Sequence, residues 1–83
     1  MSTSTLTLDP KTNGNAQVTP DRFPANITIS FSPQGQAEAF YGVDGQSPSI
    51  PLRAGQTKVT INVNSLQLSY RVVSGLAKIQ WEL

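Results

Sequence analysis

The chain has 83 residues, of which 37% are hydrophobic and only 13% are charged, with a formal net charge of +1. This length predicts a single domain near the lower limit of chains that fold alone, and the many neutral polar residues (9 Ser, 8 Thr, 5 Asn and 7 Gln) favour strands and turns over helices. The charges are scattered, which excludes the basic stripe of a nucleic-acid-binding surface, and no apolar run is long enough to span a membrane.

Residues 1–19 are polar and predict either a flexible N-terminal arm or an edge hairpin. Apolar and polar residues alternate over Thr5–Leu8, which favours a first strand, and Ala16–Val18 can form the return strand. Between them, Asn13-Gly14-Asn15 is typical of a turn because Asn and Gly tolerate positive φ. A third interpretation is an arm that pairs with the sheet of a neighbouring subunit. The β-domain itself is predicted over residues 20–83.

The next segments predict a connector, a half-buried strand and an edge strand. Two prolines in Thr19–Pro24 favour a connector, in which we expect Phe23 to fill one end of the core. Apolar residues alternate with Ser and Thr over Asn26–Ser32, as in a strand with one buried face. Ile50-Pro51-Leu52 is short and contains proline, which favours the edge of a sheet.

The strand predicted over Ala37–Val43 has an ambiguous pattern. Tyr41 belongs to one alternating apolar set, but Phe40 lies on the other side of the strand. Either a bulge near Gly42 reconciles the two aromatic residues, or one face meets the core and the other meets a partner. Phe40 and Tyr41 are therefore candidate partner contacts.

The C-terminal third predicts three strands, Lys58–Val63, Leu66–Val73 and Leu76–Leu83, whose large apolar residues fall in phase. Two-residue turns between them would give an antiparallel meander in which Leu68 faces Trp81. The predicted fold class is all-β: a small antiparallel β-sandwich or flattened barrel with essentially no helix, in which earlier strands cover the meander. An immunoglobulin-like order, with the first two of these strands in different sheets, stays open because Asn64-Ser65 is a weaker turn pair than Asn-Gly.

The meander register also places two cationic residues, Arg71 and Lys78, opposite each other on the polar face. Directly opposed like charges are mildly destabilising. Either the two long side chains splay into water, or they form a small contact for an anionic group of a partner. Arg71 and Lys78 therefore join Phe40 and Tyr41 as candidate partner contacts.

No residue pattern predicts catalysis, a metal or a cofactor. The chain has no His and no Cys, which removes the usual zinc ligands, the usual general base and a thiol nucleophile. The five acidic residues are dispersed, and Asp44-Gly45 lacks the ligand spacing and terminal Glu of a calcium loop. The sequence therefore predicts a binding or structural module rather than an enzyme.

The stretch from Ile50 to Thr57, running into Val59-Thr60-Ile61, together with the low charge and the many neutral polar residues, resembles small all-β virion proteins of bacteriophages. This class contains head-decoration, capsid-cementing and fibre proteins. The resemblance covers the whole chain in style and includes no motif whose functional residues can be transferred. It implies a structural protein of the virion that acts through protein–protein contacts, as a symmetric homo-oligomer, often a trimer, on a capsid lattice. The alternative function is a carbohydrate- or surface-binding accessory module.

Overall fold

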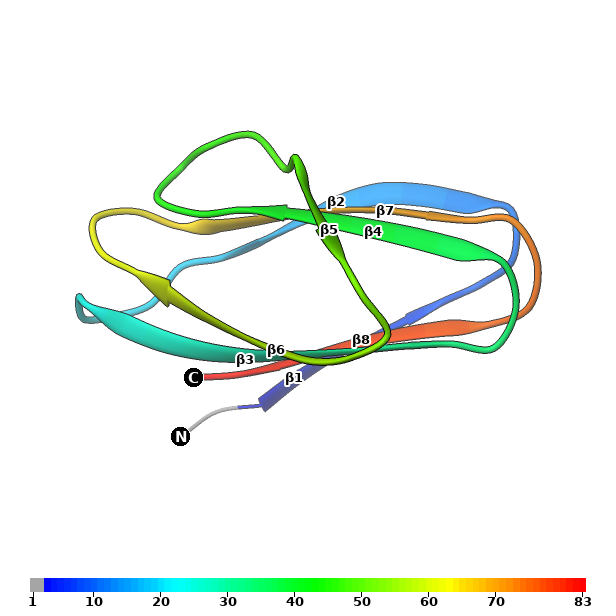
Figure 1. Ribbon diagram of the computed structural model, residues 1–83, viewed down its shortest axis with the longest axis horizontal. Helices are drawn as coiled ribbons and strands as arrows, with labels where there is room; N and C mark the ends of the chain where they lie inside the picture. Colours follow the sequence, from blue (N-terminus) through cyan, green and yellow to red (C-terminus); the bar gives the residue numbers. More distant parts are fainter. Residues whose placement is uncertain (1–2) are drawn as a thin grey trace.

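In the computed structural model, which describes residues 3–83, the chain forms eight strands and no helix. The described residues accordingly include no helix that could cross a membrane. The strands are β1 (Thr3–Leu8), β2 (Thr12–Val18), β3 (Ala25–Pro33), β4 (Ala37–Gly42), β5 (Ile50–Leu52), β6 (Gly55–Ile61), β7 (Leu66–Val72) and β8 (Ala77–Glu82). They form two antiparallel sheets with the orders β1-β8-β3-β6 and β2-β7-β4-β5, which lie as two layers in Figure 1. The predicted all-β sandwich is confirmed.

The strand order is that of a jelly roll. The pairs β1·β8, β2·β7, β3·β6 and β4·β5 are those of one long hairpin with its tip at the β4–β5 connection. The hairpin is rolled up so that β3 also pairs with β8 and β4 also pairs with β7. Two four-stranded antiparallel sheets connected in this way define the jelly-roll architecture.

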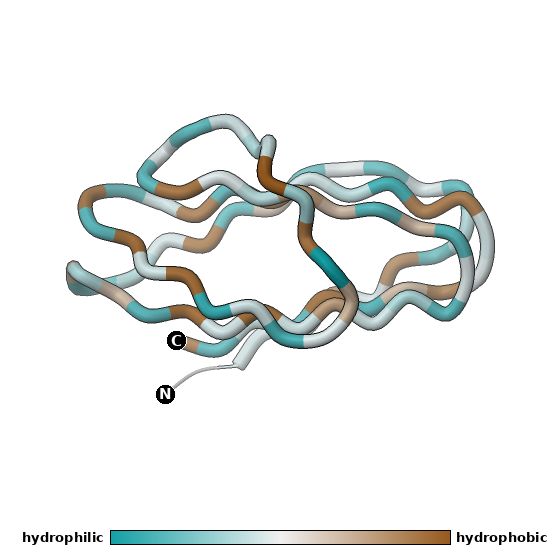
Figure 2. Tube along the Cα trace, viewed as in Figure 1, coloured by the Kyte–Doolittle hydropathy of each residue, from teal (hydrophilic) through white to brown (hydrophobic). Residues whose placement is uncertain are grey.

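The core lies between the two sheets and is built from the inward residues of every strand. Apolar and polar residues alternate along the strands, as Figure 2 shows, and this is the period of two that a pleated strand requires. The fully covered centre contains Ile29, Ile61, Leu68 and Ile79, each with no exposed surface. The predicted inward positions of these strands are thereby confirmed.

The predicted C-terminal meander is wrong, because β6, β7 and β8 do not pair with one another. β6 pairs with β3, β7 pairs with β2 and β4, and β8 pairs with β1 and β3. The alternative in which β6 and β7 lie in different sheets is confirmed on that point, although the overall order is not immunoglobulin-like. Leu68 and Trp81 both point inward, but from opposite sheets. Val63, expected inside, lies in the β6–β7 connection and is 73% exposed.

The first two strands do not form a hairpin with each other. β1 is an edge strand of one sheet and β2 is an edge strand of the other, joined by residues 9–11. Leu8 and Val18 bring both strands into the core, so residues 3–18 are part of the sandwich. Met1 and Ser2 of the predicted arm lie outside the described residues.

The predicted turn at Asn13-Gly14-Asn15 is also wrong, since these residues lie within β2. Gly14 allows the Tyr70 side chain to lie close to the β2 main chain, because a Cβ added at Gly14 would lie only 2.7 Å from the Tyr70 hydroxyl oxygen. Phe23, expected to fill one end of the core, is 43% exposed in the β2–β3 connection. The predicted edge position of Ile50–Leu52 is confirmed, because β5 ends its sheet.

Candidate functional site

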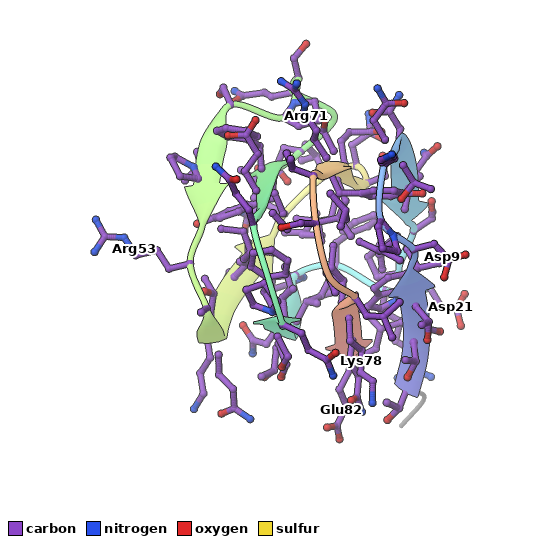
Figure 3. All side chains as sticks on the ribbon, turned by 90° about the vertical axis from the view of Figure 1, so that its right-hand side faces the viewer. Asp9, Asp21, Arg53, Arg71, Lys78 and Glu82 are labelled. Atoms are coloured by element: carbon purple, nitrogen blue, oxygen red, sulfur yellow. The ribbon has the colours of Figure 1, made fainter. Side chains whose placement is uncertain are left out.

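The structure brings two of the four predicted contact residues together and separates the other two. Phe40 and Arg71 lie on the outer face of the β2-β7-β4-β5 sheet, where both line one hollow. Tyr41 points inward and packs against the core. Lys78 lies on the outer face of the other sheet, so Arg71 and Lys78 project from opposite sides of the molecule in Figure 3.

The predicted opposition of Arg71 and Lys78 is therefore wrong. Arg71 of β7 stands opposite Asn13 on one side and Glu38 on the other. The prediction failed because it depended on β7 and β8 pairing, whereas these strands belong to different sheets. The cross-strand partners of Arg71 are therefore an amide and a carboxylate, not a second cation.

The hollow that contains Phe40, here called the Phe40 hollow, has a volume of about 390 Å³ and is lined by Asn13, Gly14, Asn15, Glu38, Phe40, Ser69, Tyr70 and Arg71. Its outward side chains come in two rows across three strands: Asn13, Arg71 and Glu38, then Asn15, Ser69 and Phe40. Neighbouring strands lie about 4.8 Å apart, and next-but-one residues about 7 Å apart along a strand, so the two rows frame a floor of roughly 10 by 7 Å.

A third row of outward residues lies beside the Phe40 hollow. Gln17 of β2 and Gln67 of β7 are directly opposite each other, beside the row of Asn15 and Ser69. Both side-chain amides donate hydrogen bonds to the hydroxyl of Ser65, at 3.0 and 2.9 Å. Ser65 is 1% exposed, so both amides are anchored to a buried group.

The outer face around the Phe40 hollow is electrically balanced. Glu38 and Arg71 are cross-strand partners of opposite charge, and they are the charged residues among the outward positions of β2, β4, β5 and β7. Opposed unlike charges at this spacing favour each other. The hollow therefore combines amides, hydroxyls and the aromatic side chains of Phe40 and Tyr70 with no net charge.

The other sheet presents a different outer face, rich in Thr, Ser and Gln and without aromatic or aliphatic side chains. Its outward residues are Thr3, Thr5, Thr7, Asn26, Thr28, Ser30, Ser32, Gln56, Lys58, Thr60, Lys78, Gln80 and Glu82. Among them, Thr60 donates a hydrogen bond of 2.9 Å to the side-chain oxygen of Asn26. This face offers hydrogen-bonding groups without an aromatic ring on which a ligand could stack.

The two sides of the sandwich differ in how their strand edges are protected. Proteins blunt exposed edges with charges, proline or very short strands. On one side, β5 has three residues including Pro51, and β6 contains Lys58. On the other side, β1 and β2 have six and seven residues without a charge or a proline. We call β1 and β2 the uncharged edge.

Asp44 joins the β4–β5 and β6–β7 connections at one end of the sandwich. Its carboxylate accepts hydrogen bonds from the main-chain N–H groups of Asn62 and Val63, at 2.7 and 3.1 Å. These hydrogen bonds lower the pKa of Asp44 below its ordinary value of 3.8. The role of this carboxylate is thus to anchor loops.

Within residues 3–83, no three acidic side chains come together as a group that could hold a metal ion. Comparison of the chain with protein-family models, with curated proteins and with solved structures gave no match.

Sequence reasoning identified Phe40 and Arg71 but missed the rest of the hollow. Asn13 and Asn15 were assigned to a turn, and Glu38 and Ser69 gave no signal of their own. The usable signal was the conflict between Phe40 and Tyr41, because one of two adjacent aromatic residues in a strand must point outward. The residues that surround Phe40 depend on which strands pair, and the pattern within one strand does not contain that information.

Proposed function

We propose that this chain is a non-enzymatic structural protein that assembles through protein–protein contacts, as a decoration, cement or fibre component of a virion. The uncharged edge is the observation that carries the assembly part. The resemblance to small phage virion proteins supports the virion part, as does the recurrence of jelly rolls in viral capsid proteins. One fold hosts many functions, so the edge supports the proposed role more strongly than the jelly roll does.

An exposed strand edge is a row of main-chain donors and acceptors that can add a further strand. β1 pairs with β8 on one side only, so its other side is available to a second chain. The three Thr residues of β1 favour strand structure, whereas Gly14 and two Asn residues make β2 a poorer template. β1 is therefore the better docking strand.

A second copy of the chain is the partner that fits β1. In an antiparallel pair centred on Thr5, a two-fold axis places Thr5 opposite Thr5 of the second copy and Thr3 opposite Thr7. All outward pairs in this register are Thr–Thr pairs, which stabilise antiparallel sheets. The result is an isologous dimer with one continuous eight-stranded sheet. A trimer would instead require β1 to pair with a different edge of its neighbour, and the measured mass distinguishes the two.

The assembly is tested by size-exclusion chromatography with light scattering over a hundredfold range of concentration. The wild-type chain, of 8.9 kDa, is expected as a homo-oligomer whose fraction rises with concentration. The double variant Thr5→Lys, Thr7→Lys places like charges along the edge and should weaken association by roughly tenfold or more. The control, Gln46→Lys with Gln56→Lys, adds the same charge at exposed positions away from β1 and should associate like the wild type.

A wild-type chain that stays monomeric over the whole range overturns the assembly proposal. An oligomer that persists unchanged in the Thr5, Thr7 variant overturns the assignment of β1 as the interface. The virion part is tested by mass spectrometry of purified particles of the virus whose genome encodes the chain. Recovery at many copies per particle supports a structural role, and absence from the particles, or a gene outside any viral genome, contradicts it.

A further inference from the structure

We infer that the Phe40 hollow binds a neutral sugar unit of a glycan. The inference concerns a different surface from the uncharged edge and does not depend on assembly. It is based on the charge balance of the hollow, its side-chain chemistry, its size and the fixed amides beside it.

The charge balance argues against ionic ligands. A phosphate or carboxylate site needs surplus Arg or Lys, but Arg71 stands beside Glu38. A cation site needs several oxygen ligands with surplus negative charge, and Glu38 supplies one carboxylate beside a guanidinium. The hollow therefore favours an uncharged ligand that is rich in hydrogen-bonding groups.

The side chains match the two kinds of surface that a sugar ring presents. Asn13 and Asn15 each provide an amide with both donors and an acceptor, and Ser69 adds a hydroxyl, so each can pair with sugar hydroxyls, which also donate and accept. Phe40 points outward from the same floor and is half-buried, so part of its ring is open to ligand. The negative face of an aromatic ring attracts polarised C–H groups such as those on the apolar face of a sugar.

The size of the hollow fits a small part of a glycan. About 390 Å³ lies within the range of small-molecule sites, roughly 300–1,000 Å³. The floor of roughly 10 by 7 Å is wide enough for a sugar ring with part of its neighbour. A shallow site that leaves most of the ligand in water predicts a dissociation constant on the order of 1 mM.

The row of amides beside the hollow is held in place. The side chains of Gln17 and Gln67 donate hydrogen bonds to the buried hydroxyl of Ser65. Fixed polar groups lose less side-chain entropy on binding than free ones. The fixed amides therefore lower the entropic cost of any contact that a ligand in the Phe40 hollow makes with them.

The test is an NMR titration of ¹⁵N-labelled protein with three neutral trisaccharides, cellotriose, maltotriose and triacetylchitotriose, and with inorganic phosphate as the anionic probe. Saturable shifts of the Asn13, Asn15, Phe40 and Ser69 amides with at least one trisaccharide are expected, and none there with phosphate. Phe40→Ala should weaken binding at least tenfold, and the matched control Phe23→Ala, an exposed phenylalanine outside the hollow, should bind like the wild type.

Asn15→Ala is the second variant, since Asn15 is exposed and its loss leaves the core intact. It should weaken binding severalfold. No shift with any of the three trisaccharides, shifts confined to other surfaces, or stronger shifts with phosphate would overturn the inference. The measurement is made at a concentration at which light scattering has defined the oligomeric state, so a failed assembly proposal and a failed sugar site are told apart.

Discussion

A substitution of Gly35 by alanine tests the jelly-roll connection directly. Gly35 lies in the β3–β4 turn and touches the β7–β8 turn. A Cβ at Gly35 would overlap the main-chain carbonyl oxygen of Ser74, and would lie 2.8 Å from the carbonyl carbon and 3.1 Å from the Cα of Gly75. The two turns are also hydrogen bonded, since the Ser74 N–H donates to the Gln36 carbonyl at 3.1 Å and the Gln36 N–H donates to the Ser74 hydroxyl at 3.2 Å.

The expected cost follows from this geometry. Main chain must move on both sides to admit one methyl group, and overpacking of this kind costs about 1–3 kcal/mol. A domain of 83 residues has a total stability of about 4–12 kcal/mol. Since 1 kcal/mol shifts the melting temperature of such a domain by about 4–8 °C, Gly35→Ala should lower it by roughly 5–20 °C.

The assay is thermal unfolding followed by circular dichroism, with Gln34→Ala as control. Gln34 is an exposed neighbour in the same turn, and its main-chain N–H, which alanine keeps, donates to the Leu76 carbonyl at 2.7 Å. Its replacement should change stability by no more than about 0.5 kcal/mol. If the melting temperature of Gly35→Ala falls no further than that of Gln34→Ala, the two turns do not touch. That result would also refute the pairing of β3 with β8.

Two further predictions concern the core and the loop anchor. Leu68→Ala, at a position without exposed surface, should lower the free energy of unfolding in urea by about 2–5 kcal/mol, while Leu76→Ala, at a site 41% exposed, should cost less than about 1 kcal/mol; equal losses would contradict the assigned core. Because the pKa of Asp44 is lowered by folding, its contribution is present above pH 3.8 and is lost as the pH falls through the folded pKa. Asp44→Asn keeps an acceptor oxygen but does not titrate, so the melting temperature of this variant should fall less than that of the wild type between pH 5 and pH 2. Melting temperatures that fall in parallel for the two proteins would refute the role of Asp44 as an anchor.

The period of two identified which residues face the core but not which strands are neighbours. Ile61, Leu68 and Ile79 were predicted inward and are fully buried. In a sandwich, an inward residue meets the same core from either sheet, so the pattern within β6, β7 and β8 is satisfied equally by a meander and by a jelly roll. The choice is made by the connections, which cross between the layers at both ends of the molecule, as Figure 1 shows.

Gly14 illustrates a second limit of local patterns. Between two asparagines, a glycine is typical of a turn, yet here it lies in mid-strand because the Tyr70 ring lies over it. Tyr70 follows 56 positions later in the chain, so no window around Gly14 contains the cause. Because Asn13 and Asn15 were assigned to the same turn, they were not recognised as outward residues of the Phe40 hollow.

The two proposed surfaces are geometrically compatible, and this has a consequence for binding. A two-fold axis perpendicular to the β1 sheet leaves each sheet facing the direction it had in the single chain. A dimer through β1 would therefore present both Phe40 hollows on the same side, away from the joined sheet. A single millimolar site contributes little, but two sites held at a fixed distance bind a repeating glycan surface with an avidity set by effective concentration. Thr5→Lys with Thr7→Lys should then abolish binding to a dense glycan surface while leaving the solution affinity for one trisaccharide unchanged, and a variant that loses both would show that the hollow and the edge are not independent.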